Sequence, residues 1–106
     1  MESQFGAKIR TLREKQNLFL RQVASLLEMD TAQLSKIEKG SRQLKREQIP
    51  IIAKILKADK EVLLTLWLAD QVMEVLNGEP LADEALKSVT QKRKQDNSKI
   101  NKKEIE

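Results

Sequence analysis

The sequence predicts an all-α protein, a bundle of five to six helices with a C-terminal helical extension. Apolar residues recur three and four positions apart along most of the chain, and no strand alternation stands out. Residues that cap or break helices, namely Ser3, Asp30, Gly40 and Pro80, fall between these periodic segments.

The first helix is expected to begin after Ser3 and to end near Asn17, with a second, shorter one over residues 20–27. Their inward positions are Phe5, Ile9 and Leu12 in the first, and Val23, Ala24 and Leu27 in the second.

A third helix is predicted over residues 31–39. Asp30 is its expected N-cap, because a carboxylate there can accept hydrogen bonds from the first exposed amides. Gly40 suits the left-handed position that often follows a helix. A fourth helix is expected over residues 46–56, and Pro50 favours a start later than residue 46, since it lacks an amide donor.

A fifth helix should begin at Asp59 or Lys60 and reach about Asn77. It is apolar on more than one face, and a domain this small has little interior to cover it. Part of this helix is therefore predicted to form a dimer interface, through Leu63, Leu66, Trp67 and Val72. A short sixth helix is expected between Leu81 and Val89.

Composition excludes several classes of site. The 106 residues include no cysteine and no histidine, which excludes disulfides, thiolate sites and histidine-based triads or zinc ligands. No glycine-rich phosphate loop is present, so we expect no enzyme, cofactor or metal. No segment approaches the ~20 apolar residues of a membrane span, and a cytoplasmic protein without a membrane partner is expected.

Charge is distributed unevenly along the chain. Residues 1–57 contain 12 Lys+Arg and 6 Asp+Glu, a net charge of +6. Residues 58–91 contain 2 Lys+Arg and 7 Asp+Glu, a net charge of −5. Residues 92–106 contain 6 Lys+Arg and 3 Asp+Glu, a net charge of +3. A basic first half favours a surface that faces a polyanion, although an ordinary solvated surface would also carry such charge.

The most informative stretch is residues 20–40, which has the layout of a helix-turn-helix. This motif needs two helices joined by a turn of three to four residues, with a small residue where they cross. Ala24 provides the small residue. Five apolar positions lock the pair, namely Val23, Leu27, Met29, Leu34 and Ile37.

These residues resemble the Cro/phage-repressor (XRE) family. The resemblance rests on Gln22–Leu27, on Leu34–Gly40 with Arg42 just after, and on Ile52–Leu56, and it covers about residues 5–64. It implies a lambda-repressor-like fold and a third helix that enters the DNA major groove. The size and helical plan are also similar to restriction-modification controller proteins.

Two positions depart from the family pattern. Leu20 stands where the family usually has a phosphate-binding glutamine, although Arg21 and Gln22 follow and could substitute. Glu28 stands where the family usually has glycine in the turn. A non-glycine residue there must accept an unusual backbone conformation, at a cost of roughly 1 kcal/mol.

The resemblance also implies the DNA contacts. The base-reading residues would be Thr31, Ala32, Gln33, Ser35 and Lys36. Gln33 suits an adenine edge, Lys36 guanine acceptors and Ala32 a thymine methyl, although Ser35 could simply bond back to its own turn. The phosphate-binding residues would be Arg21, Gln22, Lys39, Arg42 and Lys45. Glu38 is expected to be structural, paired with Arg10 or Arg13.

The sequence thus predicts a helix-turn-helix DNA-binding domain at residues 1–64, a dimerising helical extension at 65–91 and a basic flexible tail at 92–106, disordered or a frayed helix. The expected function is a homodimeric transcription regulator, such as a repressor, that binds double-stranded DNA at an inverted repeat. The alternative is an antitoxin-type protein-interaction module that docks a toxin on the acidic segment 58–91. An enzyme is the third hypothesis and the one that the sequence supports least.

Overall fold

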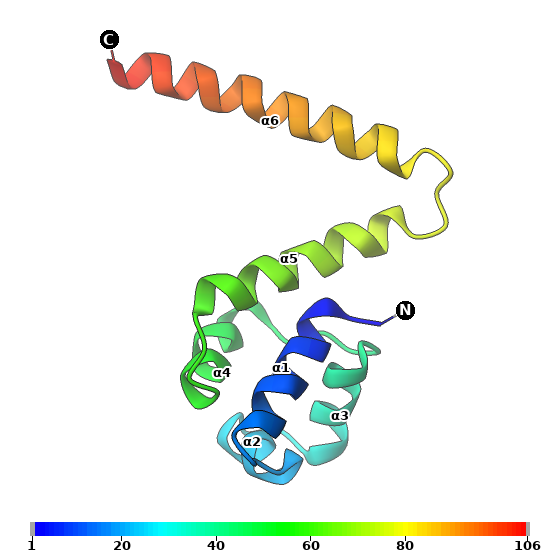
Figure 1. The fold of residues 1–106 in the computed structure, drawn as a ribbon, viewed down its shortest axis with the longest axis vertical. Coiled ribbons are helices and arrows are strands. Elements are labelled where there is room, and N and C mark those ends of the chain that lie inside the picture. Colours follow the sequence, from blue (N-terminus) through cyan, green and yellow to red (C-terminus); the bar gives the residue numbers. More distant parts are fainter. Residues whose placement is uncertain (1, 106) are drawn as a thin grey trace. The chain divides into compact units, whose positions relative to one another are not determined.

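The computed structural model describes the backbone of residues 2–105 and the side chains of residues 2–97. Within these residues it contains helices and no strands (Figure 1). The helices are α1 (Gln4–Lys15), α2 (Leu20–Leu26), α3 (Thr31–Lys39), the 3₁₀ turn η1 (Arg46–Gln48), α4 (Ile49–Ile55), α5 (Lys60–Leu76) and α6 (Ala82–Ile105). The all-α prediction is confirmed.

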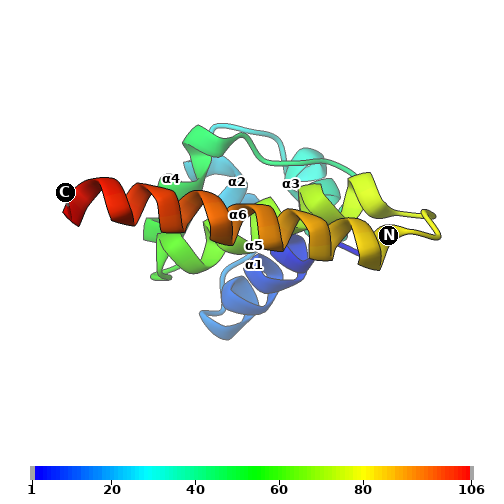
Figure 2. The same ribbon diagram turned by 90° about the horizontal axis from the view of Figure 1, so that it is seen from above.

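The chain divides into two compact units, residues 1–73 and residues 74–106. The first unit contains α1 to α4 and most of α5, and it encloses the hydrophobic core. Within it, α3 packs against both α1 and α2, and Figure 2 shows α2 and α3 on the same side of the unit. The largest of the fully buried core side chains are Ile9, Val23, Leu34, Ile37, Leu44, Ile49, Ile52, Leu56 and Leu63.

Proline determines how the fourth helix begins. The segment from residue 46 first forms the 3₁₀ turn η1, and the α-helix starts at Ile49 with Pro50 in its first positions. A proline there loses no hydrogen bond, because the first amides of a helix have no intrahelical acceptor. The later start that the sequence favours is therefore confirmed.

The N-terminus of α1 is capped from two directions. Ser3 Oγ accepts a hydrogen bond from the Gly6 amide at 2.8 Å, as its position predicts. Asp70, on α5, adds a second cap: its carboxylate accepts from the amides of Gln4 at 2.9 Å and Phe5 at 3.0 Å, and from the Ser3 hydroxyl at 2.6 Å. This carboxylate ties α5 to the start of α1.

Burial along α5 corrects the predicted dimer interface. Leu63 is 0% exposed, so it belongs to the core and cannot meet a second subunit. Leu66 and Trp67 are half-buried against the same core, whereas Val72 is 47% exposed. The sequence misplaced Leu63 because helical periodicity shows that a helix has two apolar faces but not which of them the core covers.

The second unit differs from expectation in the length of its helix. The sequence predicts a short sixth helix that ends near Val89, but α6 continues through the basic segment to Ile105. On its surface, Lys92 Nζ lies 3.4 Å from Asp96 Oδ1, one turn further along, and such ion pairs stabilise an exposed helix. Within the described residues, no helix is long and apolar enough to cross a membrane.

Gly6 marks a close approach between α1 and α3. A Cβ at this position would lie 2.5 Å from the Ile37 carbonyl oxygen and 2.6 Å from that of Glu38. Backbone atoms cannot move aside as a flexible side chain can, so only glycine allows the two helices to lie this close.

We predict that Gly6→Ala destabilises the protein. Helix propensity alone would favour alanine by about 1 kcal/mol, but overpacking against backbone costs about 3 kcal/mol, so the net loss should be about 2 kcal/mol. Urea denaturation followed by circular dichroism measures this difference. A variant more stable than the parent would show that α1 and α3 are not held at this distance.

Candidate nucleic-acid interface

The turn between α2 and α3 has the geometry that the motif requires. Glu28 adopts φ +56°, the left-handed conformation expected of the residue that stands in place of glycine. The Met29 amide then donates to the Ala24 carbonyl at 3.0 Å and closes the turn. Ala24 is buried at the helix crossing, and the predicted lock is confirmed, with Val23, Leu27, Leu34 and Ile37 buried and Met29 half-buried.

The outward side of α3 carries the predicted base-reading residues. Thr31, Ala32 and Lys36 are exposed, and Gln33 and Ser35 are half-buried. Ala32 and Lys36 lie on the side of α3 opposite Leu34, and Gln33 and Ser35 flank that side. Thr31 is exposed at the first turn of the helix.

Asp30 corrects one expectation about the start of α3. It occupies the N-cap position, with an extended backbone, but its side chain makes no capping hydrogen bond. The carboxylate is exposed beside Thr31 instead. It therefore places a negative charge at the edge of the predicted base-reading residues, where the sequence alone suggested only a structural cap.

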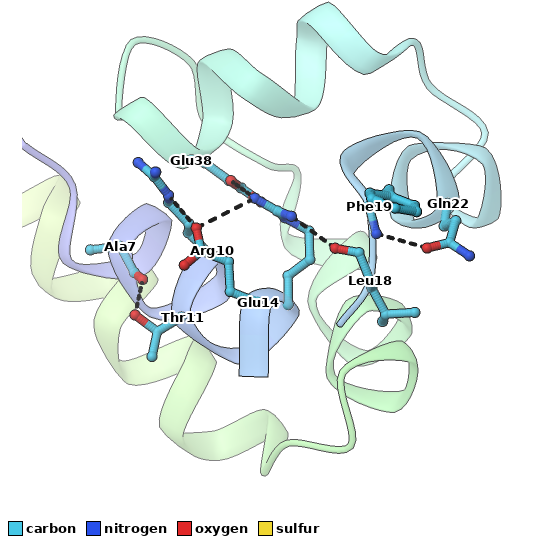
Figure 3. Close-up of polar contacts among 9 residues, drawn as sticks. Ala7, Arg10, Thr11, Glu14, Leu18, Phe19, Gln22 and Glu38 are labelled. Carbon is cyan, nitrogen blue, oxygen red and sulfur yellow. Dashed lines mark hydrogen bonds and ion pairs between the residues drawn. The ribbon is translucent and has the colours of Figure 1, made fainter. Parts of the chain in front are cut away.

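An ion pair between half-buried Arg13 and buried Glu38 joins α3 to α1. Arg13 Nε lies 2.8 Å from Glu38 Oε2, and Arg13 Nη2 lies 3.1 Å from Glu38 Oε1, so the contact is bidentate. The hydrogen bonds with Glu38 raise the pKa of Arg13 above its usual value. Figure 3 shows Glu38 directed toward α1, where Arg10 pairs with Glu14 instead at 2.8 Å.

This pair settles which residue neutralises Glu38. Of the two arginines that the sequence proposes, Arg13 is the partner. Because Glu38 is buried and paired, it adds no uncompensated negative charge to the outward side of α3. The exposed charges toward the C-terminal half of that helix are those of Lys36 and Lys39.

The loop after α3 carries the next two candidate phosphate ligands. Gly40 ends the helix at φ +88°, and the Ser41 amide donates to the Lys36 carbonyl at 3.0 Å. Arg42 and Lys45 project into solvent on either side of Leu44, which is buried. Within the described residues, neither of these cations nor Lys39 forms an ion pair.

The start of α2 shows how the chain adapts to its departure from the family pattern. Leu20 packs against the core, while Gln22 Oε1 accepts the Phe19 amide at 2.7 Å (Figure 3). The guanidinium of Arg21 lies over the Phe19 ring, 4.9 Å from its centre. Phe19 is 60% exposed, and sequence reasoning missed it because periodicity gives no reason to assign a role to an outward aromatic residue.

We predict that Glu38→Gln lowers the free energy of unfolding by about 2 kcal/mol. The change removes the charge that pairs with the half-buried guanidinium of Arg13, and leaves only the exposed carboxylate of Glu14, 3.9 Å from Arg13 Nη2. Chemical denaturation measures the loss. Glu14→Gln is the matched control, since it removes a carboxylate from a solvent-exposed pair and should shift the midpoint little. Equal effects of the two variants would contradict the assignment.

No group of side chains in the described residues could hold a metal ion.

Comparison with known proteins identifies the domain that contains this surface. Searches of curated proteins and of solved structures gave no significant match. Residues 4–66, more than half of the chain, match the family model described as a helix-turn-helix domain. The chain therefore belongs to the helix-turn-helix domain family of DNA-binding regulators.

Proposed function

We propose that the protein is a transcription regulator that recognises an inverted-repeat operator as a homodimer. The observation that carries this proposal is the surface of α3: exposed base-reading side chains stand beside cations, while the one acidic residue within the helix is buried and paired. A helix with this surface is suited to the major groove, where side chains reach base edges.

The candidate contacts divide into two classes. Thr31, Ala32, Gln33, Ser35 and Lys36 would read bases, because their side chains are exposed or half-buried on α3. Phosphate contacts would come from Arg21, Gln22, Lys39, Arg42 and Lys45, all of them exposed. The side-chain oxygen of Gln22, Oε1, already accepts a hydrogen bond from the Phe19 amide. The side-chain NH₂ group of Gln22 would therefore be the donor to phosphate.

Dimerisation would supply the second half-site. One recognition helix reads only a few base pairs, so two must be held about 34 Å apart to reach successive major grooves. Exposed apolar residues on α5 provide a surface for this purpose, namely Val62, Leu68, Val72 and Met73. At about 100° per residue, Leu68 and Val72 lie on the side of α5 opposite Leu63, and Val62 and Met73 lie at the edge of that side.

Selection from a random double-stranded DNA library, at stated salt, tests the proposal directly. We expect enrichment of an inverted repeat with half-sites about one helical turn apart. Binding that is weak, equal for all sequences and abolished by moderate salt would refute sequence-specific regulation.

Lys36 and Arg42 should give different signatures in that assay. Lys36→Ala is predicted to lose discrimination at one base pair, by about 1–3 kcal/mol, because base edges carry the sequence information. Arg42→Ala should weaken all sequences alike and reduce the salt slope by about 1, because it contacts only phosphate. Fluorescence anisotropy titrations over a range of salt separate the two patterns, and identical patterns would contradict these roles.

Val72→Glu is predicted to shift the protein from dimer to monomer, because two added carboxylates would face each other across a symmetric apolar interface. Light scattering measures the mass. Leu26→Glu is the matched control, since Leu26 is 62% exposed but lies on α2. A Val72→Glu protein that remains dimeric would place the interface elsewhere.

A second candidate function, binding of a protein partner, is favoured by one observation. An open apolar groove lies between α2 and α4, lined by Leu26, Pro50, Ile51, Lys54 and Ile55. A toxin-like partner would place an amphipathic helix there, with an acidic residue facing Lys54. Under this alternative Leu26→Glu would abolish the complex, and DNA selection would enrich no operator.

A further inference from the structure

Trp67 is the only tryptophan of the chain, and it links α5 to the loop after α3. Its indole Nε1 donates a hydrogen bond of 2.7 Å to the backbone carbonyl of Leu44, 23 residues earlier. The ring is half-buried against the core rather than free on the surface. This contact gives Trp67 a role that the predicted dimer interface did not include.

The loop that receives this hydrogen bond has no regular secondary structure between Ser41 and Lys45. Its first residue is tied to α3 through the Ser41 amide, and its last through the Lys45 amide, which donates to Gln48 Oε1 at 3.1 Å. Between these ends, the Leu44 side chain is buried and its carbonyl is held by Trp67.

The orientation of the Leu44 carbonyl determines the direction of its neighbours. A peptide unit is planar, so fixing this carbonyl also fixes the amide of Lys45 and limits how its side chain leaves the loop. Arg42, two residues before Leu44, lies in the same short segment. Both cations are exposed, and neither has an ion pair within the described side chains that would orient it.

We propose that Trp67 is a positioning residue for DNA binding, which holds the 41–45 loop so that Arg42 and Lys45 meet the phosphate backbone together. The inference rests on the proposed function, because it assigns these cations to DNA. Ordering the loop before DNA arrives avoids the entropic cost of ordering it on binding. Trp67 reads no base, so its effect should be independent of sequence.

Trp67→Phe is the principal test, because it keeps an aromatic ring and removes the indole N–H. We expect binding to weaken about three- to tenfold for operator and random DNA alike, and the salt slope to fall by about 1. Base preference and dimer mass should not change. The isostere benzothienylalanine, which has sulfur in place of the N–H, should behave like phenylalanine and controls for lost packing.

Asp70→Asn is the matched control on the same helix. It weakens the tie between α5 and α1 and leaves the Leu44 contact in place. We expect lower stability in urea but an unchanged salt slope. If both variants lower the slope equally, general loosening of α5 would explain the result and the positioning role would be wrong.

A readout without DNA separates this inference from the proposed function. Trypsin should cleave after Arg42 faster in Trp67→Phe than in the parent, beyond what their difference in global stability explains. If the parent protein binds DNA and Trp67→Phe has the same salt slope and cleavage rate as the parent, the inference is wrong but the proposed function stands. If Trp67→Phe is monomeric, Trp67 belongs to the dimer interface and its positioning role is wrong. Parent protein that binds no DNA would overturn both proposals.

Discussion

The bidentate contact between Arg13 and Glu38 is the interaction on which the candidate interface depends. Removing two charges from water is costly, and only a well-formed pair with further hydrogen bonds repays that cost. Arg13 meets this condition, because its Nη1 also donates to the Leu18 carbonyl at 2.8 Å. One guanidinium thus joins α1, the C-terminal end of α3 and the segment that leads into α2.

The pair has an electrostatic consequence as well as a mechanical one. It fixes the turn of α3 that faces α1, and it removes the negative charge of Glu38 from the surface that would face DNA. The cations on and after α3 are then left without internal partners among the described residues. A polyanion can engage such side chains without first breaking an existing ion pair.

Helix α5 extends this bracing to the rest of the first unit. Asp70 holds the start of α1, and Trp67, three residues earlier, holds the loop after α3. These two side chains leave α5 on nearly the same side, toward the core, while its opposite side carries exposed apolar residues. The helix proposed to pair two subunits is therefore also the helix that orders a proposed DNA-contacting loop.

The helical fold, the boundaries of α3 and the apolar positions around Ala24 could be predicted from the sequence, because they depend on local backbone preferences and on a 3.6-residue period, which neighbouring residues encode. The unusual backbone at Glu28 was predicted from the resemblance, because Glu28 stands where the family usually has glycine. The packing of the helices was needed to show that Glu38 pairs with Arg13, that Leu63 faces inward, that Asp70 caps α1 and that Trp67 binds the Leu44 carbonyl. Each of these joins residues 23 to 67 positions apart or depends on which side of a helix meets the core. Periodicity within a single helix contains neither kind of information, because it does not specify the neighbouring helix.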